Sequence, residues 1–347
     1  METLPIELCE RGLVPDALAR AGMRRLIASR LTGPEAEDGE ARNAAYRALV
    51  AAARTGPIAR HTDEANDQHY EVPADFFTLV LGPRLKYSGC LFADGIADLG
   101  AAEEAMLGLY AERAGLADGQ RILDLGCGWG SFCLWAAARY PDAEVHAVSN
   151  SAGQRAHIEA RAAALGLGNL RVETCDINRY EPAGAPFDRV VSVEMFEHMS
   201  NHRALMARIA DWLAPDGRFF LHIFCHRLLA YPFATGGRYD WMGRHFFTGG
   251  LMPSENWPLE FQTHLTVRDH WWVSGRHYRA TADAWLANLD ARRDAVRALF
   301  ADAYGAALAD RQRHRWRMFF MAVSELFGFE DGNQWGVGHY LFGPRAT

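Results

Sequence analysis

Three side chains that can carry a proton lie close together near the middle of the chain. Residues 193–198 read Val-Glu-Met-Phe-Glu-His, which places Glu194, Glu197 and His198 directly after an apolar run expected to form a buried strand. Charge beside a buried strand is costly unless it has a partner or a task. A general base works best with a pKa near the working pH, which suits His198 or a carboxylate perturbed by its neighbours. We therefore take all three as candidate catalytic residues; the structural alternative is that Glu197 caps a helix beginning at Asn201.

A glycine-rich turn follows the first strong strand pattern of the chain. Residues 121–130 read Arg-Ile-Leu-Asp-Leu-Gly-Cys-Gly-Trp-Gly, and their apolar positions fit a parallel strand covered on both faces. A dinucleotide site would place its third glycine three residues after the second, whereas here Gly126, Gly128 and Gly130 alternate with other residues. This spacing resembles motif I of class I methyltransferases. It predicts an S-adenosylmethionine site that includes Asp124 and Cys127.

Two further strand ends offer polar groups to the same ligand, because open α/β sheets bind ligands at the carboxyl ends of their strands. The second strand is followed by Asn150 and Gln154, where most methyltransferases and dehydrogenases carry a carboxylate for the ribose hydroxyls. These amides would supply the hydrogen bonds instead, and helix capping by Asn150 is compatible with that role. After the third strand, Asp176 can accept the adenine amine beside Ile177. The competing interpretation of Asp176 is an exposed loop aspartate.

The elements that must position these residues alternate between strands and helices. Strands are predicted at 121–125, 144–149, 170–174, 188–193, 217–224 and 335–342, and helices at 130–140, 151–164, 201–213, 281–299 and 304–326. Such alternation favours a parallel sheet with right-handed crossovers. We therefore predict an α/β fold of the class I, Rossmann-like methyltransferase type, with a seven-stranded, mostly parallel sheet and helices on both faces.

The same pattern divides the chain into four parts. Residues 1–95 are expected to form an N-terminal helical and cap region, and residues 96–225 the Rossmann-like core that binds S-adenosylmethionine. Residues 226–280 are rich in glycine, proline and aromatic side chains, and are expected to form a lid insertion over the active site. Residues 281–347 would supply C-terminal helices and the last strand of the core.

Composition argues against several classes of protein. The net charge of −7 disfavours nucleic acid as a partner, because phosphate binding usually needs a basic face. The apolar runs fall short of the roughly 20 residues that span a bilayer, and the N-terminus lacks a signal-peptide pattern. The six cysteines show no metal-ligand spacing. We expect a cytoplasmic protein with reduced thiols and no bound metal.

The segment 11–31 departs from this acidic character. It carries five arginines against one aspartate, interleaved with leucine and isoleucine. A basic amphipathic helix of this kind can lie on an anionic membrane. It can equally pack on its own protein. The sequence leaves open both lipid contact through this helix and the formation of a homodimer.

Several ordered blocks outside the glycine turn identify a family. They are His69-Tyr70-Glu71-Val72-Pro73, Tyr87-Ser88, Asn150-Ser151 with Gln154, Phe196-Glu197-His198, His277-Tyr278 and Trp316. Together they resemble the cyclopropane-fatty-acyl-phospholipid synthase family of methyltransferases over roughly residues 60–345. Within that family, Glu194 and the blocks 222–226 and 239–242 are most similar to the plant coclaurine N-methyltransferase branch.

The resemblance implies a role for each matching residue. Glu194, Glu197 and His198 would handle a substrate amine and its proton. The cofactor would be S-adenosylmethionine, leaving as S-adenosylhomocysteine. Its contacts would be Tyr87, Ser88, Asp124, Gly126, Cys127, Gly128, Gly130, Asn150, Gln154, Asp176 and Ile177. The substrate would meet His69, Tyr70, Phe196, His222, Trp241, Tyr278, Trp316 and Phe319, of which Trp316 and Phe319 would shape an aromatic pocket.

Two departures separate the chain from the lipid-modifying members of the family. Those enzymes resemble one another in a Tyr-Ser-Cys block whose cysteine helps hold a bicarbonate ion that acts as base, and here that position is Gly89. They also tend to carry a cysteine in the C-terminal helix where this chain has Val323. Because Glu197, His222 and Tyr278 match other positions around the ion, bicarbonate binding is weakened as a hypothesis but stays open.

The sequence leads to three alternative functions. The favoured one is transfer of a methyl group from S-adenosylmethionine to the nitrogen of a small, aromatic amine, with a Glu/His base. The first alternative is a cyclopropane-fatty-acyl-phospholipid synthase acting on unsaturated acyl chains of membrane lipid, in which Glu197 and His198 could take the proton of the carbocation. The second is a non-catalytic protein that binds S-adenosylmethionine. Fold alone cannot separate them, because function resides in the site.

Overall fold

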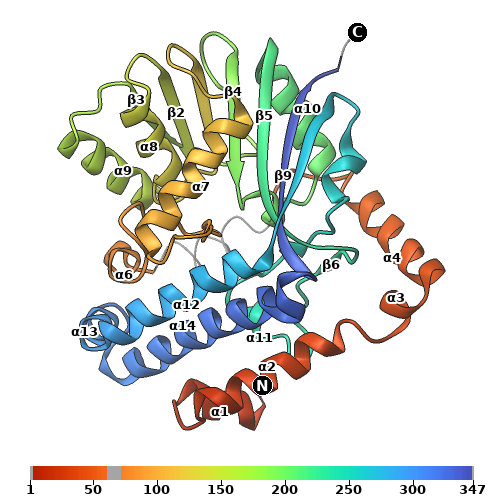
Figure 1. Ribbon diagram of the computed structural model, residues 1–347, viewed down its shortest axis with the longest axis vertical. Helices are drawn as coiled ribbons and strands as arrows, with labels where there is room; N and C mark the ends of the chain where they lie inside the picture. The colour runs from red at the N-terminus through yellow and green to blue at the C-terminus, as the bar shows by residue number, and fades with distance from the viewer. Residues whose placement is uncertain (1–2, 61–71, 346–347) are drawn as a thin grey trace.

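Five parallel strands and two antiparallel ones form a single twisted sheet in this computed structural model, which describes residues 3–60 and 72–345 (Figure 1). The strand order is β3-β2-β1-β4-β5-β9-β8. The strands are β1 (Arg121–Leu125), β2 (Glu144–Ser149), β3 (Leu170–Thr174), β4 (Phe187–Val193), β5 (Leu213–His226), β8 (Leu265–Val273) and β9 (Trp335–Pro344). Strands β1 to β5 pair in parallel, and β9 and then β8 add in the antiparallel direction. The predicted Rossmann-like fold is confirmed.

Helices cover both faces of the sheet because side chains alternate along each strand. Ile122 and Val191 point into one apolar core, whereas their neighbours Leu123 and Val190 point into the other. The first core is shared with α7 (Leu99–Ala114), α8 (Ser131–Arg139) and α9 (Ala152–Ala164), and the second with α4 (Gly39–Ala52) and α10 (His202–Trp212). Strands buried on both sides explain the continuous apolar runs seen in the sequence.

The segment expected to be a lid contributes to the sheet. Its residues 265–273 form β8, which pairs with β9 at the edge, and helix α12 already begins at Gly275. The part outside the sheet is therefore 227–264, shorter than the expected 226–280. It contains β6 (Tyr231–Pro232), α11 (Trp241–His245), β7 (Leu251–Met252) and the 3-10 turn η2 (Trp257–Phe261). The edge strand escaped prediction because one of its faces is only partly buried, so its sequence, LTVRDHWWV, lacks a clear apolar run.

Three C-terminal helices lie beyond the carboxyl ends of the parallel strands (Figure 1). They are α12 (Gly275–Ala291), α13 (Arg293–Tyr304) and α14 (Ala306–Phe327), and the short helix α6 (Ala74–Val80) packs against α12 and α13. The expected helix at 281–299 is thus divided between α12 and α13, while 304–326 corresponds to α14. Two further 3-10 turns are η1 (Phe196–His198), which follows β4, and η3 (Phe329–Gly332), which lies between α14 and β9.

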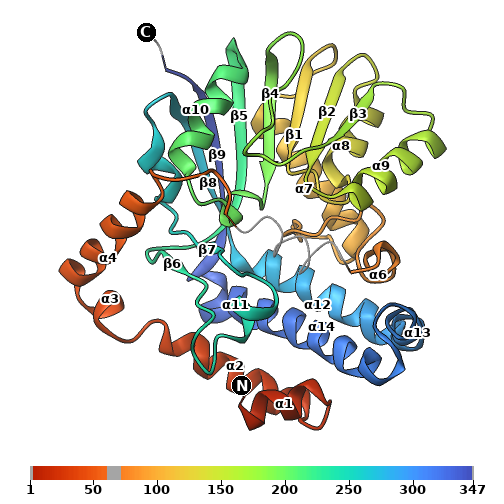
Figure 2. The same cartoon turned by 180° about the vertical axis from the view of Figure 1, so that it is seen from behind.

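The N-terminal helices run along the outside of α14, as the reverse view shows (Figure 2). They are α1 (Leu4–Glu10) and α2 (Asp16–Ser29), and the short α3 (Pro34–Glu37) follows them and packs on α4. Arg20 on α2 donates hydrogen bonds to Asp283 and Glu325, both at 3.0 Å, and Arg24 donates to Glu325 at 2.8 Å. The basic helix therefore directs these two arginines towards acidic side chains of its own protein, although Arg24 stays half exposed.

Buried Glu10 ties three elements together. It accepts hydrogen bonds from Trp241 of α11 at 2.9 Å and from Arg315 of α14 at 2.8 Å. Burial raises its pKa, but the hydrogen bonds from Arg315, Trp241 and Arg311 prevail and bring it to about 2. The end of α1 is thus fixed to both α14 and the segment 227–264.

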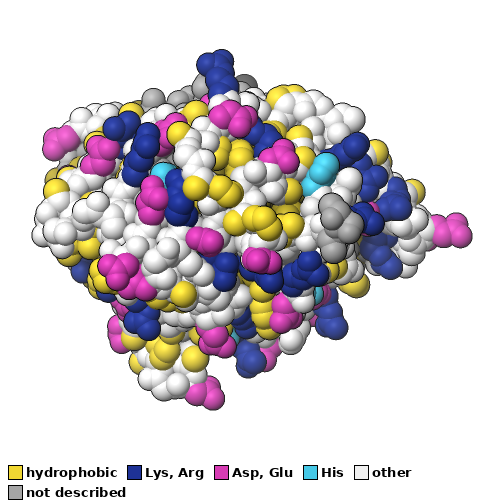
Figure 3. All heavy atoms as spheres, turned by 90° about the horizontal axis from the view of Figure 1, so that it is seen from above, with side chains coloured by type: hydrophobic (Ala, Val, Ile, Leu, Met, Phe, Trp, Pro, Cys, Tyr) yellow, Lys and Arg dark blue, Asp and Glu magenta, His cyan; other side chains and the backbone are white. Residues whose placement is uncertain are grey.

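Two surface observations bear on partners. Among the described residues, no helix is both long and apolar enough to cross a bilayer. On the face drawn in Figure 3, basic side chains are interspersed with Asp and Glu, and they are arginines, because the single lysine of the chain, Lys86, is buried. That face therefore shows mixed charge, in keeping with the net charge of −7.

Candidate active site

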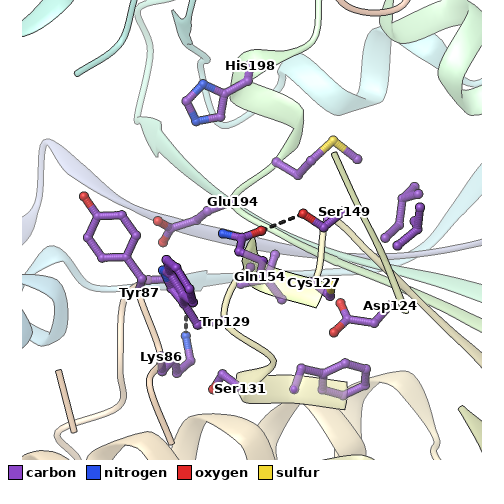
Figure 4. Close-up of a pocket in the computed structure, with 18 of the residues that line it drawn as sticks. Lys86, Tyr87, Asp124, Cys127, Trp129, Ser131, Ser149, Gln154, Glu194 and His198 are labelled. Carbon is purple, nitrogen blue, oxygen red and sulfur yellow. Dashed lines mark hydrogen bonds between the residues drawn. The ribbon is translucent and has the colours of Figure 1, made fainter. Parts of the chain in front are cut away.

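A pocket opens at the carboxyl ends of β1, β2 and β4, and Figure 4 shows how ten of its residues lie. It brings together thirteen of the residues singled out from the sequence: Tyr87, Ser88, Asp124, Gly126, Cys127, Gly128, Asn150, Gln154, Ile177, Glu194, His198, Tyr278 and Phe319. These residues come from seven separate stretches of chain. Their convergence supports the idea that the strand ends build one site.

The glycine turn forms the floor of the pocket. Gly126 and Gly130 have positive φ angles of 85° and 86°, and a Cβ on either would lie 2.7 Å from a side-chain carbon, of Met195 and Ile158 respectively. No other residue could occupy these two positions without displacing a neighbour. Gly128 lines the pocket with no atom near its would-be Cβ, so the backbone there is open to a ligand. Gly130 itself does not line the pocket, and it is the N-cap residue directly before α8.

Two polar atoms in the pocket wall fit a bound ligand. Within the described part of the chain, Asp124 Oδ2 and Ser131 Oγ are buried without a hydrogen-bond partner, which is rare unless a ligand or water completes the site. Burial raises the pKa of Asp124 to about 7. At the end of β2, Ser149 donates to Gln154 Oε1 at 2.6 Å and thereby orients the amide (Figure 4). These groups suit a polar cofactor such as S-adenosylmethionine.

Asp176 does not reach the pocket. Its Oδ1 accepts hydrogen bonds from the backbone N–H of Asn178 at 2.8 Å and from the side chain of Asn178 at 3.0 Å. This geometry favours the loop-aspartate interpretation of Asp176, and its contact with adenine stays a prediction. Its neighbours Cys175 and Ile177 line the pocket instead.

Glu194 is held by three donors at the wall of the pocket. Its Oε1 accepts from the backbone N–H of Gly89 and from Nε2 of His222, both at 3.0 Å, and its Oε2 accepts from the hydroxyl of Tyr278 at 2.6 Å. Burial raises the pKa of Glu194, and the nearby charge of Lys86 opposes that effect. Its backbone φ of +48° is unusual for a residue other than glycine, and such conformations cluster at functional sites.

Lys86 supplies a buried positive charge that the sequence did not reveal. Its side chain lines the pocket, donates to Ser88 Oγ and to the carbonyl of Gly89 (2.8 Å), and lies 5.1 Å from the ring centroid of Tyr110. Burial lowers its pKa, and the charge of Glu194 opposes this. Lys86 is the only lysine in the sequence, a signal that could have drawn attention to it, but no local pattern predicts its burial, which depends on contacts made by the fold.

His198 and Glu197 point in different directions from the same 3-10 turn. His198 lines the pocket, with its ring stacked on Phe247 at a centroid distance of 5.6 Å. Glu197 is fully buried behind the pocket, where Oε1 accepts from the backbone N–H of Phe224 at 2.8 Å. Burial raises its pKa well above the usual range, so the group favours the protonated form. Glu197 does not cap α10 either, because Asn201 does so at 3.0 Å through Ala204 N–H.

Comparison with known proteins identifies the family. Residues 59–331 match the family model described as mycolic acid cyclopropane synthetase. The chain belongs to this family. It is 36% identical to (S)-coclaurine N-methyltransferase of Thalictrum flavum subsp. glaucum, over 96% of this chain and 93% of that protein. It is 29% identical to the cyclopropane-fatty-acyl-phospholipid synthase of Escherichia coli (strain K12), over 78% of this chain and 66% of that protein.

A solved structure extends the likeness to three dimensions. The crystal structure of coclaurine N-methyltransferase bound to N-methylheliamine and S-adenosylhomocysteine superposes with a TM-score of 0.92 at 35% identity, covering 97% of this chain and 98% of that one. These relatives confirm the expected class, an S-adenosylmethionine-dependent methyltransferase, and the predicted place of the chain in its family.

Several residues expected to meet the substrate lie behind the pocket of this methyltransferase. Phe196 stacks on Phe219 at 5.5 Å in the second core, and Trp316 packs 4.6 Å from Phe76. Trp241 binds Glu10, and His222 lies behind Glu194. Phe319 and Tyr278 do line the pocket, whereas His69 and Tyr70 lie outside the described residues. The aromatic wall also includes residues that sequence reasoning missed: Trp129, Phe224, Phe247 and Trp285.

The donors expected around a bicarbonate ion are already taken in this methyltransferase. His222 and Tyr278 both bind the carboxylate of Glu194, as does the backbone N–H of Gly89. A side chain at position 89 would also place its Cβ 3.1 Å from the ring of Tyr278. Cys90 cannot replace the missing thiol, because its Sγ is buried against the carbonyl of Ser88 at 3.6 Å. The residues present therefore do not fit a bicarbonate ion, because the donors that would bind it already bind the carboxylate of Glu194.

Proposed function

We propose that this methyltransferase transfers a methyl group from S-adenosylmethionine to the nitrogen of a small aromatic amine. The observation that carries the proposal is the carboxylate of Glu194, which three donors hold at the wall of the pocket. A carboxylate held at this point suits a cationic amine that must lose a proton. The relatives with the highest similarity reported above are named for N-methylation of coclaurine.

The amine must be neutral before it can attack. An alkylamine has a pKa of about 10, so at pH 7 most of it is protonated. In the proposed reaction, the N–H bond of the ammonium breaks and its proton passes to Glu194, forming an O–H bond. The nitrogen lone pair then attacks the methyl carbon while the carbon–sulfur bond breaks, and its electrons neutralise the sulfonium. A positioned base of this kind accelerates a reaction by roughly 10²–10⁴-fold.

The remaining pocket residues would position the two reactants. His198 faces the pocket on the side of the segment 227–264, stacked on Phe247 of that segment, and we assign it a role in orienting the amine or in accepting its proton. Trp129, Trp285 and Phe319 can attract the sulfonium and the cationic product through their ring faces. Most of the remaining acceleration would come from alignment of nitrogen, methyl and sulfur. We assign residues 227–264 to a lid over this pocket.

The lipid-directed alternative has less support. The donor set that would hold bicarbonate binds Glu194, and Arg20 and Arg24 of the basic helix are engaged with Asp283 and Glu325. These two arginines are therefore less available for anionic lipid. Exposed Leu18 and Leu26 on the same helix still favour a membrane.

The test offers both classes of acceptor to one enzyme. Purified protein is incubated with methyl-labelled S-adenosylmethionine, a panel of aromatic and alkyl amines, and vesicles of unsaturated phospholipid. We expect the label in an aromatic amine and only background in the lipid. Label in the acyl chains would overturn the proposal. Saturable binding of the cofactor with no transfer to any acceptor would support a non-catalytic protein.

A further inference from the structure

A chain of hydrogen bonds leads from Glu194 away from the pocket to Arg113. Glu194 Oε1 is 3.0 Å from Nε2 of His222, and Nδ1 of His222 is 2.9 Å from Nε2 of His339. Nδ1 of His339 is in turn 2.6 Å from Nη1 of Arg113. His222 and His339 are directly paired residues on β5 and β9, and both are fully buried. Arg113 comes from α7 and stacks on Trp271 at 4.7 Å.

Arg113 fixes which atom donates and which accepts in each of these hydrogen bonds. A guanidinium has only donors, so Nδ1 of His339 must accept from Arg113. A neutral imidazole carries one proton, which therefore sits on Nε2 of His339 and is donated to Nδ1 of His222. The proton of His222 is then on Nε2, where it is donated to Glu194. Burial lowers the pKa of both histidines, and the nearby charges of Lys86 and Arg113 lower it further, so each ring is neutral.

The opposite tautomer of His222 has its own partner and must be excluded. The hydroxyl of Tyr110 lies 2.8 Å from Nδ1 of His222 and could accept a proton from it. Nε2 would then present a lone pair to the carboxylate of Glu194 at 3.0 Å, which is repulsive while Glu194 is ionised. Donation from His339 removes this alternative, because Nδ1 cannot carry a proton and accept one from His339 at the same time.

We propose that Arg113 and His339 are positioning residues, which fix the tautomer of His222 and so hold the carboxylate of Glu194 ionised and aimed at the pocket. The catalytic meaning of this inference rests on the proposed function, although the tautomers themselves do not. Neither residue lines the pocket. This series of hydrogen bonds does not conduct the substrate proton away from the pocket, because Nε2 of His222 already carries a proton and Arg113 offers no lone pair. The proton taken up by Glu194 therefore leaves through the pocket.

Other titratable and charged groups face the same network and set the background for its pH dependence. Around Glu194 they are Lys86 and Cys90 before α7, Tyr110 on α7, Glu197 after β4 and Tyr278 on α12. Around Arg113 they are Glu112 on the same helix and Asp269 on β8. The variants below leave all of these unchanged.

The first measurement reads the tautomers without any substrate. Full-length protein labelled with ¹⁵N-histidine is examined by long-range ¹H–¹⁵N correlation between pH 6 and 8, and H222Q and H339Q assign the two rings. We expect both rings to be neutral with the proton on Nε2, and Arg113→Met to give a mixture of tautomers at His339. A proton on Nδ1 of either ring in the native protein would overturn the proposal. This result stands whether or not an amine is the acceptor.

The second measurement follows the acid limb of kcat/KM against pH with the amine that the labelling test identifies. Loss of a donor to a buried carboxylate raises the pKa of that carboxylate. The acid limb should therefore move to a higher pH by about one unit in Arg113→Met and His339→Leu, which lowers kcat/KM roughly tenfold at pH values below the limb. His339→Gln carries an acceptor for Arg113 and a donor for His222 on one amide, and should restore most of the native profile. A purely structural role would lower the melting temperature without moving the limb.

Arg139→Met is the matched control. Arg139 is an exposed arginine at the end of α8 that lies 5.5 Å from the ring of Trp135, so this variant also loses one charge and one arginine–tryptophan contact. Its pH profile and its histidine tautomers should equal those of the native protein. A limb that moves equally in Arg139→Met and Arg113→Met would assign the effect to net charge and contradict the proposal.

Discussion

Replacing Glu194 by glutamine should remove the base while keeping the pocket intact. The amide oxygen can still accept from Gly89 N–H and from Nε2 of His222, which both bind the same carboxylate oxygen. The amide nitrogen can donate to the hydroxyl of Tyr278, because that hydroxyl can accept as well as donate. All three contacts therefore have a counterpart. Glu194→Ala would instead leave three donors unsatisfied, each at a cost of about 1–3 kcal/mol.

The expected loss follows from the role of the carboxylate. Removal of a general base should lower kcat/KM at pH 7 by roughly 10²–10⁴-fold, or about 3–5 kcal/mol of transition-state stabilisation. The buried ammonium of Lys86 loses its countercharge, so some loss of stability is also expected. Because free amine becomes more abundant as the pH rises, the deficit should shrink by up to about tenfold per pH unit between pH 7 and 9.

The assay compares Glu194→Gln with Glu197→Gln. Transfer of labelled methyl is measured from pH 6 to 9, and binding of S-adenosylhomocysteine is measured separately. Glu197→Gln replaces a buried carboxyl whose pKa is already raised well above its usual range, and whose Oε1 contact with Phe224 N–H an amide can keep. It should lose less than about threefold in kcat/KM, since a neutral acid and an amide are nearly isosteric. Equal losses in the two variants, or a Glu194→Gln deficit that does not depend on pH, would refute the assignment of Glu194 as base.

Three further predictions concern stability, cofactor binding and the substrate wall. The pKa of Glu10, brought to about 2, lies below its value of about 4.5 in the unfolded chain, so the stability that Glu10 contributes is present above pH 4.5 and is lost as the pH falls towards 2; Glu10→Gln should cost roughly 3 kcal/mol at pH 7 in chemical denaturation, and an unchanged midpoint would contradict the buried ion pairs. Burial raises the pKa of Asp124 to about 7, so the ligand-free protein should lose stability as the pH rises from about 4 to 7. Asp124→Asn should flatten this dependence of the melting temperature on pH, and it should also weaken binding of S-adenosylhomocysteine. Gly89→Cys should push the ring of Tyr278, 3.1 Å from the added Cβ, and lower kcat several-fold without restoring dependence on bicarbonate; activity that rises with added bicarbonate would show that the ion can share the donors of Glu194.

Much of the fold was predictable because its signals are local. The parallel strands are buried on both faces, so Ile122, Leu123, Val190 and Val191 stand in continuous apolar runs that need no partner to be recognised. The glycine turn is equally local, since the positive φ of 85° and 86° at 126 and 130 strongly favours glycine, and the alternating glycines can be seen in the sequence. The edge strand β8 was missed because its sequence carries no such run.

The sequence by itself determined that Glu194, Glu197 and His198 would lie together at a strand end. Only the tertiary structure decided which of them faces the pocket, because the side chains of one 3-10 turn diverge and Glu197 turns towards the backbone of β5. The same holds for the partners of Glu194. His222 lies 28 residues away and Tyr278 lies 84 residues away. No local pattern records contacts across such separations; they exist because β4, β5 and α12 are brought together by burial of apolar surface.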